Sequence, residues 1–153
     1  MAFRWWVLAA LSATFLKLCL ASQGCGTNSP YTLGMINSDN VTTPANGSRT
    51  FHVYLPLSYD SSTEVPLVLL FHGGGGTGLG AQKYGMNCYA DLYDFVVVYP
   101  DGLFNTWNGG ACCGKASAAN VDDMLFVNVM LDYLESILCI NTAKIFATGS
   151  FFS

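Results

Sequence analysis

Charged side chains are scarce in this sequence. Only 10% of its 153 residues are charged, whereas an ordinary soluble domain has about 25%. With six basic residues and a formal net charge of −4, the chain has no basic stripe to neutralise phosphates, which excludes nucleic acid as a partner. It also has only two histidines and no Cys-x-x-Cys pair matched by a second ligand pair. We therefore expect neither a metal site nor a cofactor.

The first segment, residues 1–21, has the layout of a secretory signal peptide. Arg4 precedes an apolar stretch from Trp5 to Leu16, and small residues follow, so that cleavage is expected after Ala21 or, alternatively, after Gly24. A membrane anchor is the other interpretation. However, Lys17 leaves the apolar stretch shorter than the ~20 residues that a spanning helix needs, so we expect no stable membrane span after cleavage. The mature protein is predicted to be extracellular.

Two glycosylation acceptors and the cysteines favour the same compartment. Asn40 and Asn46 each begin an Asn-x-Ser/Thr sequence in a polar stretch, residues 22–50, that reads as an exposed, glycosylated loop region with at most one short strand around residues 31–37. An oxidising compartment would pair the cysteines. Five remain after cleavage, so one thiol stays free, joins another chain, or has its partner in sequence that is not here. The candidates for disulfides are Cys25, Cys88, Cys112, Cys113 and Cys139.

The remaining chain, residues 51–149, alternates apolar runs with glycine-rich and polar segments. Residues 49–56 have the period of a half-buried outer strand, and residues 66–71, 95–100 and 144–149 read as strands buried on both faces. A short helical patch is expected over 81–93 and a long loop over 103–120. Asp122 or Asp123 is expected to cap a helix that runs to about Leu138 and is covered on more than one side, and the two adjacent carboxylates are explained by stabilising the start of that helix. This order predicts an α/β fold with a mostly parallel sheet and flanking helices.

A run of glycines follows the strand at 66–71, where open α/β sheets bind ligands. Backbone N–H groups that no side chain shields can approach and stabilise a developing negative oxygen. The segment is therefore a candidate oxyanion loop, formed by His72, Gly73, Gly74 and Gly75.

Taken together, these motifs resemble the α/β-hydrolase superfamily, and within it the secreted feruloyl esterases and polyhydroxybutyrate depolymerase-like esterases. The resemblance rests on RTFHVYLPLSY, PLVLLFHGGGGTG, VVYPDG, TWNGGACCG, NVDDM and CINTAKIFATG, in this order. It implies that the strand ending at Gly149 leads into a Gly-x-Ser-x-Gly turn with the nucleophilic serine, that an acid and a histidine follow later, and that the Gly74 amide donates to the oxyanion. His72 is expected to hold the loop by hydrogen bonds.

The sequence departs from this pattern after Gly149. The nucleophile position is occupied by Phe151, and neither Ser150 nor Ser153 has the small neighbours that such a turn requires. No catalytic residue is therefore expected to be intact. We interpret residues 150–153 as an aberrant tail, residues 51–149 as a partial, incomplete hydrolase domain, and the chain as an amino-terminal part without activity of its own.

Three functions remain open on this basis. The first is a secreted serine esterase of feruloyl esterase type, acting on ester-bearing plant cell-wall polysaccharide. The second keeps the chemistry but acts on a polyester such as polyhydroxybutyrate. The third is a non-catalytic secreted glycoprotein or binding module, in which Trp107 stacks on a sugar or an aromatic acid, although packing within its own loop is the simpler role for this side chain.

Overall fold

A computed structural model describes residues 21–110 and 114–149. Residues 1–20 of the expected signal peptide, Cys112 and Cys113, and the tail at 150–153 with Phe151 lie outside the described residues. No helix in the described ranges is long and apolar enough to cross a membrane.

The centre of the fold is a five-stranded mixed sheet with the order β1-β2-β4-β3-β5. β1 and β2 form an antiparallel hairpin, β2 runs antiparallel to β4, and β3 is parallel to both β4 and β5. All strands except β2 therefore point the same way, as the prediction of a mostly parallel sheet requires. The strands are β1 Ile36–Thr43, β2 Gly47–Tyr54, β3 Val65–Phe71, β4 Val96–Pro100 and β5 Ile140–Gly149.

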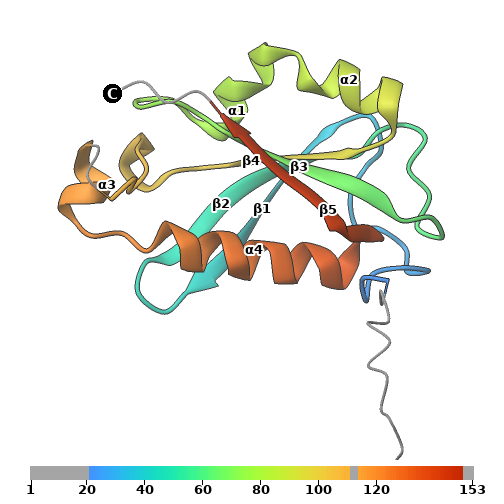
Figure 1. Ribbon diagram of the computed structural model, residues 1–153, viewed down its shortest axis with the longest axis horizontal. Helices are drawn as coiled ribbons and strands as arrows, with labels where there is room; N and C mark the ends of the chain where they lie inside the picture. Colours follow the sequence, from blue (N-terminus) through green and yellow to red (C-terminus); the bar gives the residue numbers. More distant parts are fainter. Residues whose placement is uncertain (1–20, 111–113, 150–153) are drawn as a thin grey trace, which may run out of the picture.

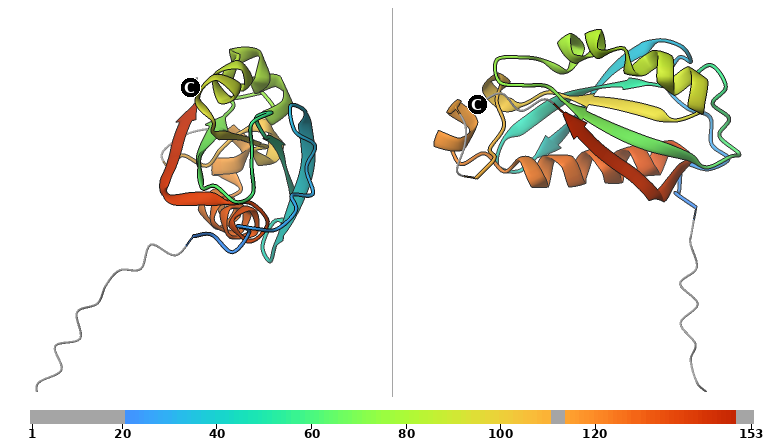
Figure 2. Two further views of the ribbon diagram at one scale, coloured as in Figure 1. Left: turned by 90° about the vertical axis from the view of Figure 1, so that its right-hand side faces the viewer. Right: turned by 45° about the horizontal axis from the view of Figure 1, so that its top comes forward.

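Helices cover both faces of this sheet. Figure 1 shows the short helices α1 and α2 on one side and the long helix α4 on the other, and Figure 2 shows the same layers from two further directions. Three short helical segments occupy connections: η1 between α1 and α2, and η2 and α3 after β4. The bounds are α1 Gly78–Ala81, η1 Gln82–Tyr84, α2 Met86–Tyr93, η2 Leu103–Asn105, α3 Gly114–Ala118 and α4 Asp123–Ile137.

Alternation along the strands divides the core into two layers. On the α4 side, Phe51 and Val53 of β2 pack with Phe126, Met130 and Leu134 of α4. On the opposite side, a smaller cluster joins the sheet to α1 and α2 through Tyr54, Leu70, Ala81, Ala90, Val97 and Tyr99. Because β4 lies between β2 and β3, all five of its residues are buried, as its β-branched run predicts.

The polar stretch expected as loop contains β1, and the short strand expected at 31–37 begins only at Ile36. The polar composition of this stretch reflects an edge position. Along β1 only Val41 and Thr43 are buried, while the remaining side chains are exposed or half-buried. The strand depends on its pairing with β2 for stability, which composition alone does not reveal.

Three other expectations also need correction. The segment 103–120, expected as a loop, contains η2 and α3. Helix α4 buries one face only, and Met124 is 70% exposed, so cover on more than one side is not observed. The strand expected at 144–149 begins at Ile140 and is mostly exposed, because among the described strands it pairs with β3 alone.

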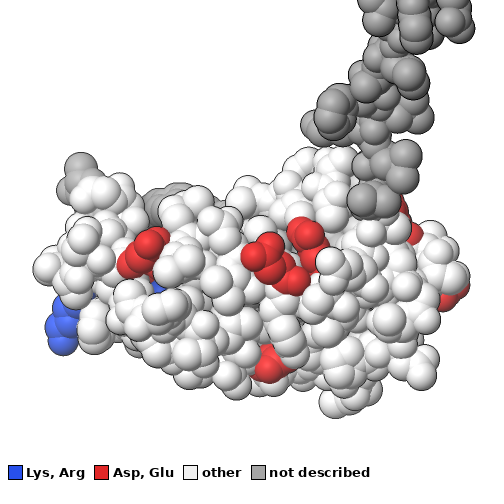
Figure 3. Space-filling view, turned by 90° about the horizontal axis from the view of Figure 1, so that it is seen from below, with Lys and Arg blue, Asp and Glu red and all other residues white. Residues whose placement is uncertain are grey.

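The amino end of α4 and the surface around it agree with the sequence. The Asp122 carboxylate accepts the Leu125 N–H at 2.8 Å, which confirms a capped helix start. Viewed from the side of α4, the surface is mainly uncharged, with scattered acidic side chains and basic atoms only towards one end (Figure 3). This face has no basic stripe.

Candidate active site

The glycine loop leaves the sheet at the carboxyl end of β3, as expected. His72 to Gly76 line an open hollow, together with Thr77, Gly80, Ala81, Lys83 and Tyr84. His72 is only 3% exposed, whereas Gly74 and Gly75 are exposed. The buried histidine thus anchors a loop whose backbone faces solvent.

His72 has the structural role that the sequence analysis assigns to it. Its Nε2 accepts the Gly102 N–H at 2.9 Å, its Nδ1 lies 2.8 Å from the Gly73 carbonyl oxygen, and its own carbonyl accepts the Trp107 indole N–H at 2.9 Å. These contacts fix the proton on Nδ1 and leave Nε2 as an acceptor. Both nitrogens are therefore occupied in holding the loop.

Trp107 packs within its own part of the fold. Its ring meets the rings of Phe71 and His72, each with a centroid distance of 5.1 Å. The half-buried indole is thereby sandwiched at the base of the glycine loop, which supports the packing role over the sugar-stacking one.

The four loop residues do not contribute equally to an oxyanion site. The Gly75 amide donates to the Asn105 carbonyl at 2.8 Å, and the Gly76 amide donates to the Gly73 carbonyl at 2.9 Å. Neither the Gly73 nor the Gly74 amide donates to an acceptor within the described residues. The expected donor, Gly74, thus keeps a proton available, whereas the Gly75 amide is engaged.

Asp101 fixes the far end of the glycine loop, a role that the sequence analysis missed. One carboxylate oxygen, Oδ1, accepts the Gly78 N–H at 2.6 Å, and the other, Oδ2, lies 3.1 Å from Nε2 of His52. The Asp101-Gly102 pair reads as a simple turn in sequence. Only the positions of His52 in β2 and Gly78 in α1 reveal that its side chain joins three elements.

A buried ion pair supports the same region from the α4 side. Arg49 is 2% exposed, and its Nη2 donates to Asp123 Oδ1 at 2.8 Å and to the Asp101 carbonyl at 3.1 Å. The guanidinium stacks on Phe126, with its carbon 4.0 Å from the ring centroid. The other oxygen of Asp123 accepts the Asn108 N–H at 2.7 Å. Asp123 therefore does more than stabilise the helix start, which was the sequence-based interpretation.

The ends of β3 and β5 lie side by side. The two strands are parallel and Phe71 pairs with Gly149, so the chain leaves β5 next to the point where the glycine loop begins. A Cβ on Gly149 would lie 2.7 Å from the Phe71 carbonyl oxygen, so this position requires glycine. Phe151, at the expected nucleophile position, lies outside the described residues.

One disulfide is present among the described cysteines, between Cys25 and Cys139. Cys88 is a free, exposed thiol on α2, so the expectation that it pairs is not met within these residues. A free thiol was one of the three alternatives for an odd number of cysteines. The expected glycosylation sites lie on the β1–β2 hairpin, with Asn40 exposed and Asn46 half-buried.

Tyr54, the last residue of β2, connects the sheet to α2. Its hydroxyl donates to Asp91 Oδ2 at 2.6 Å. Burial, with the Asp91 hydrogen bond and charge in addition, raises the pKa of Tyr54 to about 12, so the phenol stays protonated and remains a donor at neutral pH. No cluster of three or more metal-ligating side chains occurs in the described part of the chain.

Among solved structures, the chain resembles S-formylglutathione hydrolase from Staphylococcus aureus, with a TM-score of 0.56 at 18% identity over 75% of this chain and 46% of that one. It also resembles a ferulic acid esterase from Anaeromyces mucronatus, with a TM-score of 0.54 at 16% identity over 82% of this chain and 52% of that one. The chain has an α/β-hydrolase fold.

The sequence comparison agrees with this fold. A curated relative, feruloyl esterase D from Neurospora crassa, is 28% identical over 94% of this chain and 49% of its own length. The resemblance to feruloyl esterases within the α/β-hydrolases is thereby confirmed. The chain spans about half the length of this relative. No family model matches the chain.

Proposed function

We propose that this chain is the amino-terminal part of a secreted serine carboxylic-ester hydrolase of feruloyl esterase type. The observation that carries the proposal is the rigid glycine loop beside the end of β5. Two amides of this loop, those of Gly73 and Gly74, have no acceptor within the described residues, and Gly149 lies beside Phe71, the residue that precedes the loop's His72. A nucleophile that follows Gly149 would therefore attack a carbonyl next to these donors.

The chemistry follows from this arrangement. Attack on an ester carbonyl places negative charge on its oxygen, and preorganised N–H donors stabilise that charge without reorganising during the reaction. Removal of one such donor typically costs a factor of about 10²–10³ in rate. The contacts of His72 with Gly102 and Trp107 hold the donors in place before the substrate arrives.

Relatives support the choice of substrate class. The curated relative is a feruloyl esterase, one solved structure is a ferulic acid esterase in complex with ferulic acid, and another is an acetyl xylan esterase from Aspergillus awamori. We infer that the full-length protein acts on ester-bearing plant cell-wall polysaccharide. The signal-peptide layout, the two glycosylation sequences and the Cys25–Cys139 disulfide favour secretion.

Hydrolysis at the glycine loop is not expected from the 153-residue chain itself. The required serine position is Phe151, and a phenyl ring offers no nucleophile. The two histidines are also committed elsewhere, because His72 holds the loop and His52 lies in β2.

The test begins with the transcript beyond the codon for Gly149. We expect an open frame that continues into Gly-x-Ser-x-Gly and later supplies an acid and a histidine. The product of that frame should hydrolyse methyl ferulate, its elbow Ser→Ala variant should not, and the 153-residue chain should also be inactive.

Other results would contradict the proposal in distinguishable ways. A transcript without the elbow would exclude esterase catalysis at this loop and favour a non-catalytic glycoprotein. A longer product that cleaves polyhydroxybutyrate but not methyl ferulate would identify a polyester depolymerase instead.

A further inference from the structure

A second hydrogen-bonded chain of side chains lies outside the glycine loop. Ser38 of β1 is directly opposite His52 of β2, and the Ser38 hydroxyl oxygen lies 2.8 Å from His52 Nδ1. The other ring nitrogen, Nε2, lies 3.1 Å from Asp101 Oδ2. A serine, a histidine and an aspartate are thus connected in the order that nucleophilic catalysis requires.

The hydrogen bonds define which atom carries each proton. The Asp101 carboxylate is an acceptor, and its other oxygen already accepts the Gly78 N–H at 2.6 Å. His52 must therefore present an N–H to Asp101 from Nε2, which leaves the Nδ1 lone pair facing Ser38. The serine hydroxyl then donates to Nδ1, and its oxygen gains nucleophilic character.

The base is fixed while the hydroxyl is accessible. His52 is 4% exposed, and its Cδ2 would lie 2.9 Å from a Cβ placed on Gly78, so α1 lies directly against the ring. Ser38, in contrast, is exposed on the edge strand of the sheet. An electrophile can reach the serine without displacing the histidine.

We propose that Ser38 is a nucleophile of a second reactive site that takes acyl groups from activated esters and phosphonyl groups from phosphonyl fluorides. His52 acts as general base and Asp101 orients it. With a phosphonyl fluoride, the Ser38 oxygen forms a bond to phosphorus, the P–F bond breaks, fluoride leaves, and the serine proton passes to His52 Nδ1. With an activated ester, the Ser38 oxygen forms a bond to the carbonyl carbon, the bond from that carbon to the alcohol or phenol oxygen breaks, the alcohol or phenol leaves, and the serine proton again passes to His52 Nδ1. In serine proteases Nε2 accepts the serine proton and Nδ1 donates to the aspartate, whereas here Nδ1 accepts and Nε2 donates. In both cases the proton passes from serine to histidine.

This inference does not rest on the proposed function. The esterase proposal needs a serine after Gly149 beside the glycine loop, whereas the second site uses only residues of β1, β2 and the end of β4. The 153-residue chain can therefore test it directly.

The Asp101→Asn variant separates this role from a structural one. In that variant the side-chain amide oxygen can still accept the Gly78 N–H, but the side-chain amide nitrogen would donate to His52 Nε2. The imidazole proton then moves to Nδ1, which donates to Ser38 and no longer accepts its proton. ¹⁵N NMR of the histidine ring should show Nε2–H in the wild type and in Ser38→Ala, and Nδ1–H in Asp101→Asn.

Labelling with a fluorophosphonate, followed by peptide mass spectrometry, measures the reactivity. We expect the label on Ser38, its loss in Ser38→Ala, and a rate at least about 100-fold lower in Asp101→Asn, within the range for a general base. Ser62→Ala is the matched control, because Ser62 is exposed and its hydroxyl donates only to the Asp60 carboxylate, with no histidine to accept its proton.

Each contrary result would overturn the proposal. These results are a label that is absent from Ser38, a Ser38 rate no higher than that of Ser62, or an Nδ1–H tautomer in the wild type. Asp101→Asn labelling within about threefold of wild type, far short of the loss expected for a general base, would overturn it as well. The Ser38→Ala comparison keeps the test valid if Asp101→Asn does not fold, because Ser38 is exposed and its removal spares the core.

Discussion

Removal of the Cys25–Cys139 disulfide should lower the free energy of unfolding by several kcal/mol. The two cysteines are 114 residues apart in sequence, so the bond closes almost the whole described chain. A cross-link that closes a loop of this length lowers the conformational entropy of the unfolded state, which stabilises the folded state by about 5 kcal/mol at 25 °C. The Cys25→Ala/Cys139→Ala double variant should lose about that much free energy of unfolding.

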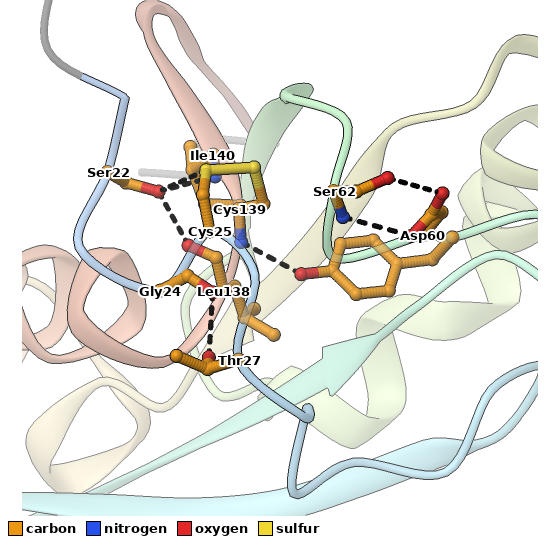
Figure 4. The surroundings of a disulfide bond; sticks show 10 residues. Ser22, Gly24, Cys25, Thr27, Asp60, Ser62, Leu138, Cys139 and Ile140 are labelled. Atoms are coloured by element: carbon orange, nitrogen blue, oxygen red, sulfur yellow. Dashed lines mark hydrogen bonds between the residues drawn. A yellow bond between two sulfur atoms is a disulfide. The ribbon is translucent and has the colours of Figure 1, made fainter.

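The neighbourhood of the disulfide predicts where the variant loosens first. The Ser22 hydroxyl donates to the Leu138 carbonyl at 2.6 Å and accepts the Ile140 N–H at 2.8 Å (Figure 4). The Gly24 amide donates to the Glu135 carbonyl at 2.9 Å. A Cβ on Gly24 would lie 2.2 Å from the Leu138 nitrogen, so this segment fits tightly against the junction of α4 and β5. Without the covalent link, hydrogen exchange should accelerate at Gly24 and Ile140 before the rest of the sheet.

Urea unfolding provides the assay. With a dependence of about 2 kcal/mol per molar urea, the midpoint should fall by about 2–3 M. Cys88→Ala is the matched control, because Cys88 is a free, exposed thiol whose removal should change stability by less than about 0.5 kcal/mol. A double variant whose midpoint falls by no more than that of the control would refute the assignment of the bond and of its role.

Three further predictions concern the networks around the glycine loop and α4. Arg49→Met leaves the Asp123 carboxylate buried without its cation and should cost about 3–5 kcal/mol in chemical denaturation, whereas adding Asp123→Leu should recover part of that loss. Trp107→Phe removes the indole N–H that binds the His72 carbonyl and should lower the free energy of unfolding by about 1 kcal/mol, with little change in the far-ultraviolet dichroism spectrum. Burial, and secondarily the charge of Asp132, raise the pKa of Glu135 above its usual value of 4.5, so the native state binds this proton more tightly and stability falls as pH rises through that pKa. Glu135→Gln should therefore raise the urea midpoint at neutral pH and leave it unchanged at a pH well below the usual glutamate pKa; an equal gain under both conditions would contradict this.

Periodicity predicted the elements whose burial is decided locally. β4 lies in the centre of the sheet, where all of its residues are buried, and its sequence is apolar throughout. α4 begins at the Asp122 cap that the sequence indicates. Most of β1 was missed, beyond the short strand expected around residues 31–37, because its stability comes from pairing with β2 and its own side chains are mostly polar. β5 reads as buried in sequence, yet Phe146 is 57% exposed, because burial there depends on a neighbour that the described residues do not supply.

The residues of the candidate site differ in the same respect: some roles follow from a local sequence pattern, and others depend on contacts between distant segments. The position of the glycine loop and the anchoring role of His72 followed from the sequence, because a histidine before a glycine run at a strand end is a local pattern. The roles of Arg49 and Asp101 could not be predicted, since each depends on partners brought together by the topology. An arginine near the start of a strand whose following residues alternate between polar and apolar was the available signal, because a buried guanidinium requires a carboxylate partner.

The segment that follows β4 holds the glycine loop in place. Gly102 binds the His72 ring, Asn105 accepts the Gly75 amide, and Trp107 binds the His72 carbonyl, while Asp101 fixes Gly78 at the far end. All four contacts come from residues 101–107, which the parallel pairing of β3 and β4 brings beside the loop. None requires a nucleophile, an acid or a catalytic histidine. The glycine loop, with the amides proposed as oxyanion donors, is therefore held by residues that precede Gly149, and under the proposed function a serine supplied after Gly149 would meet a loop that is already ordered.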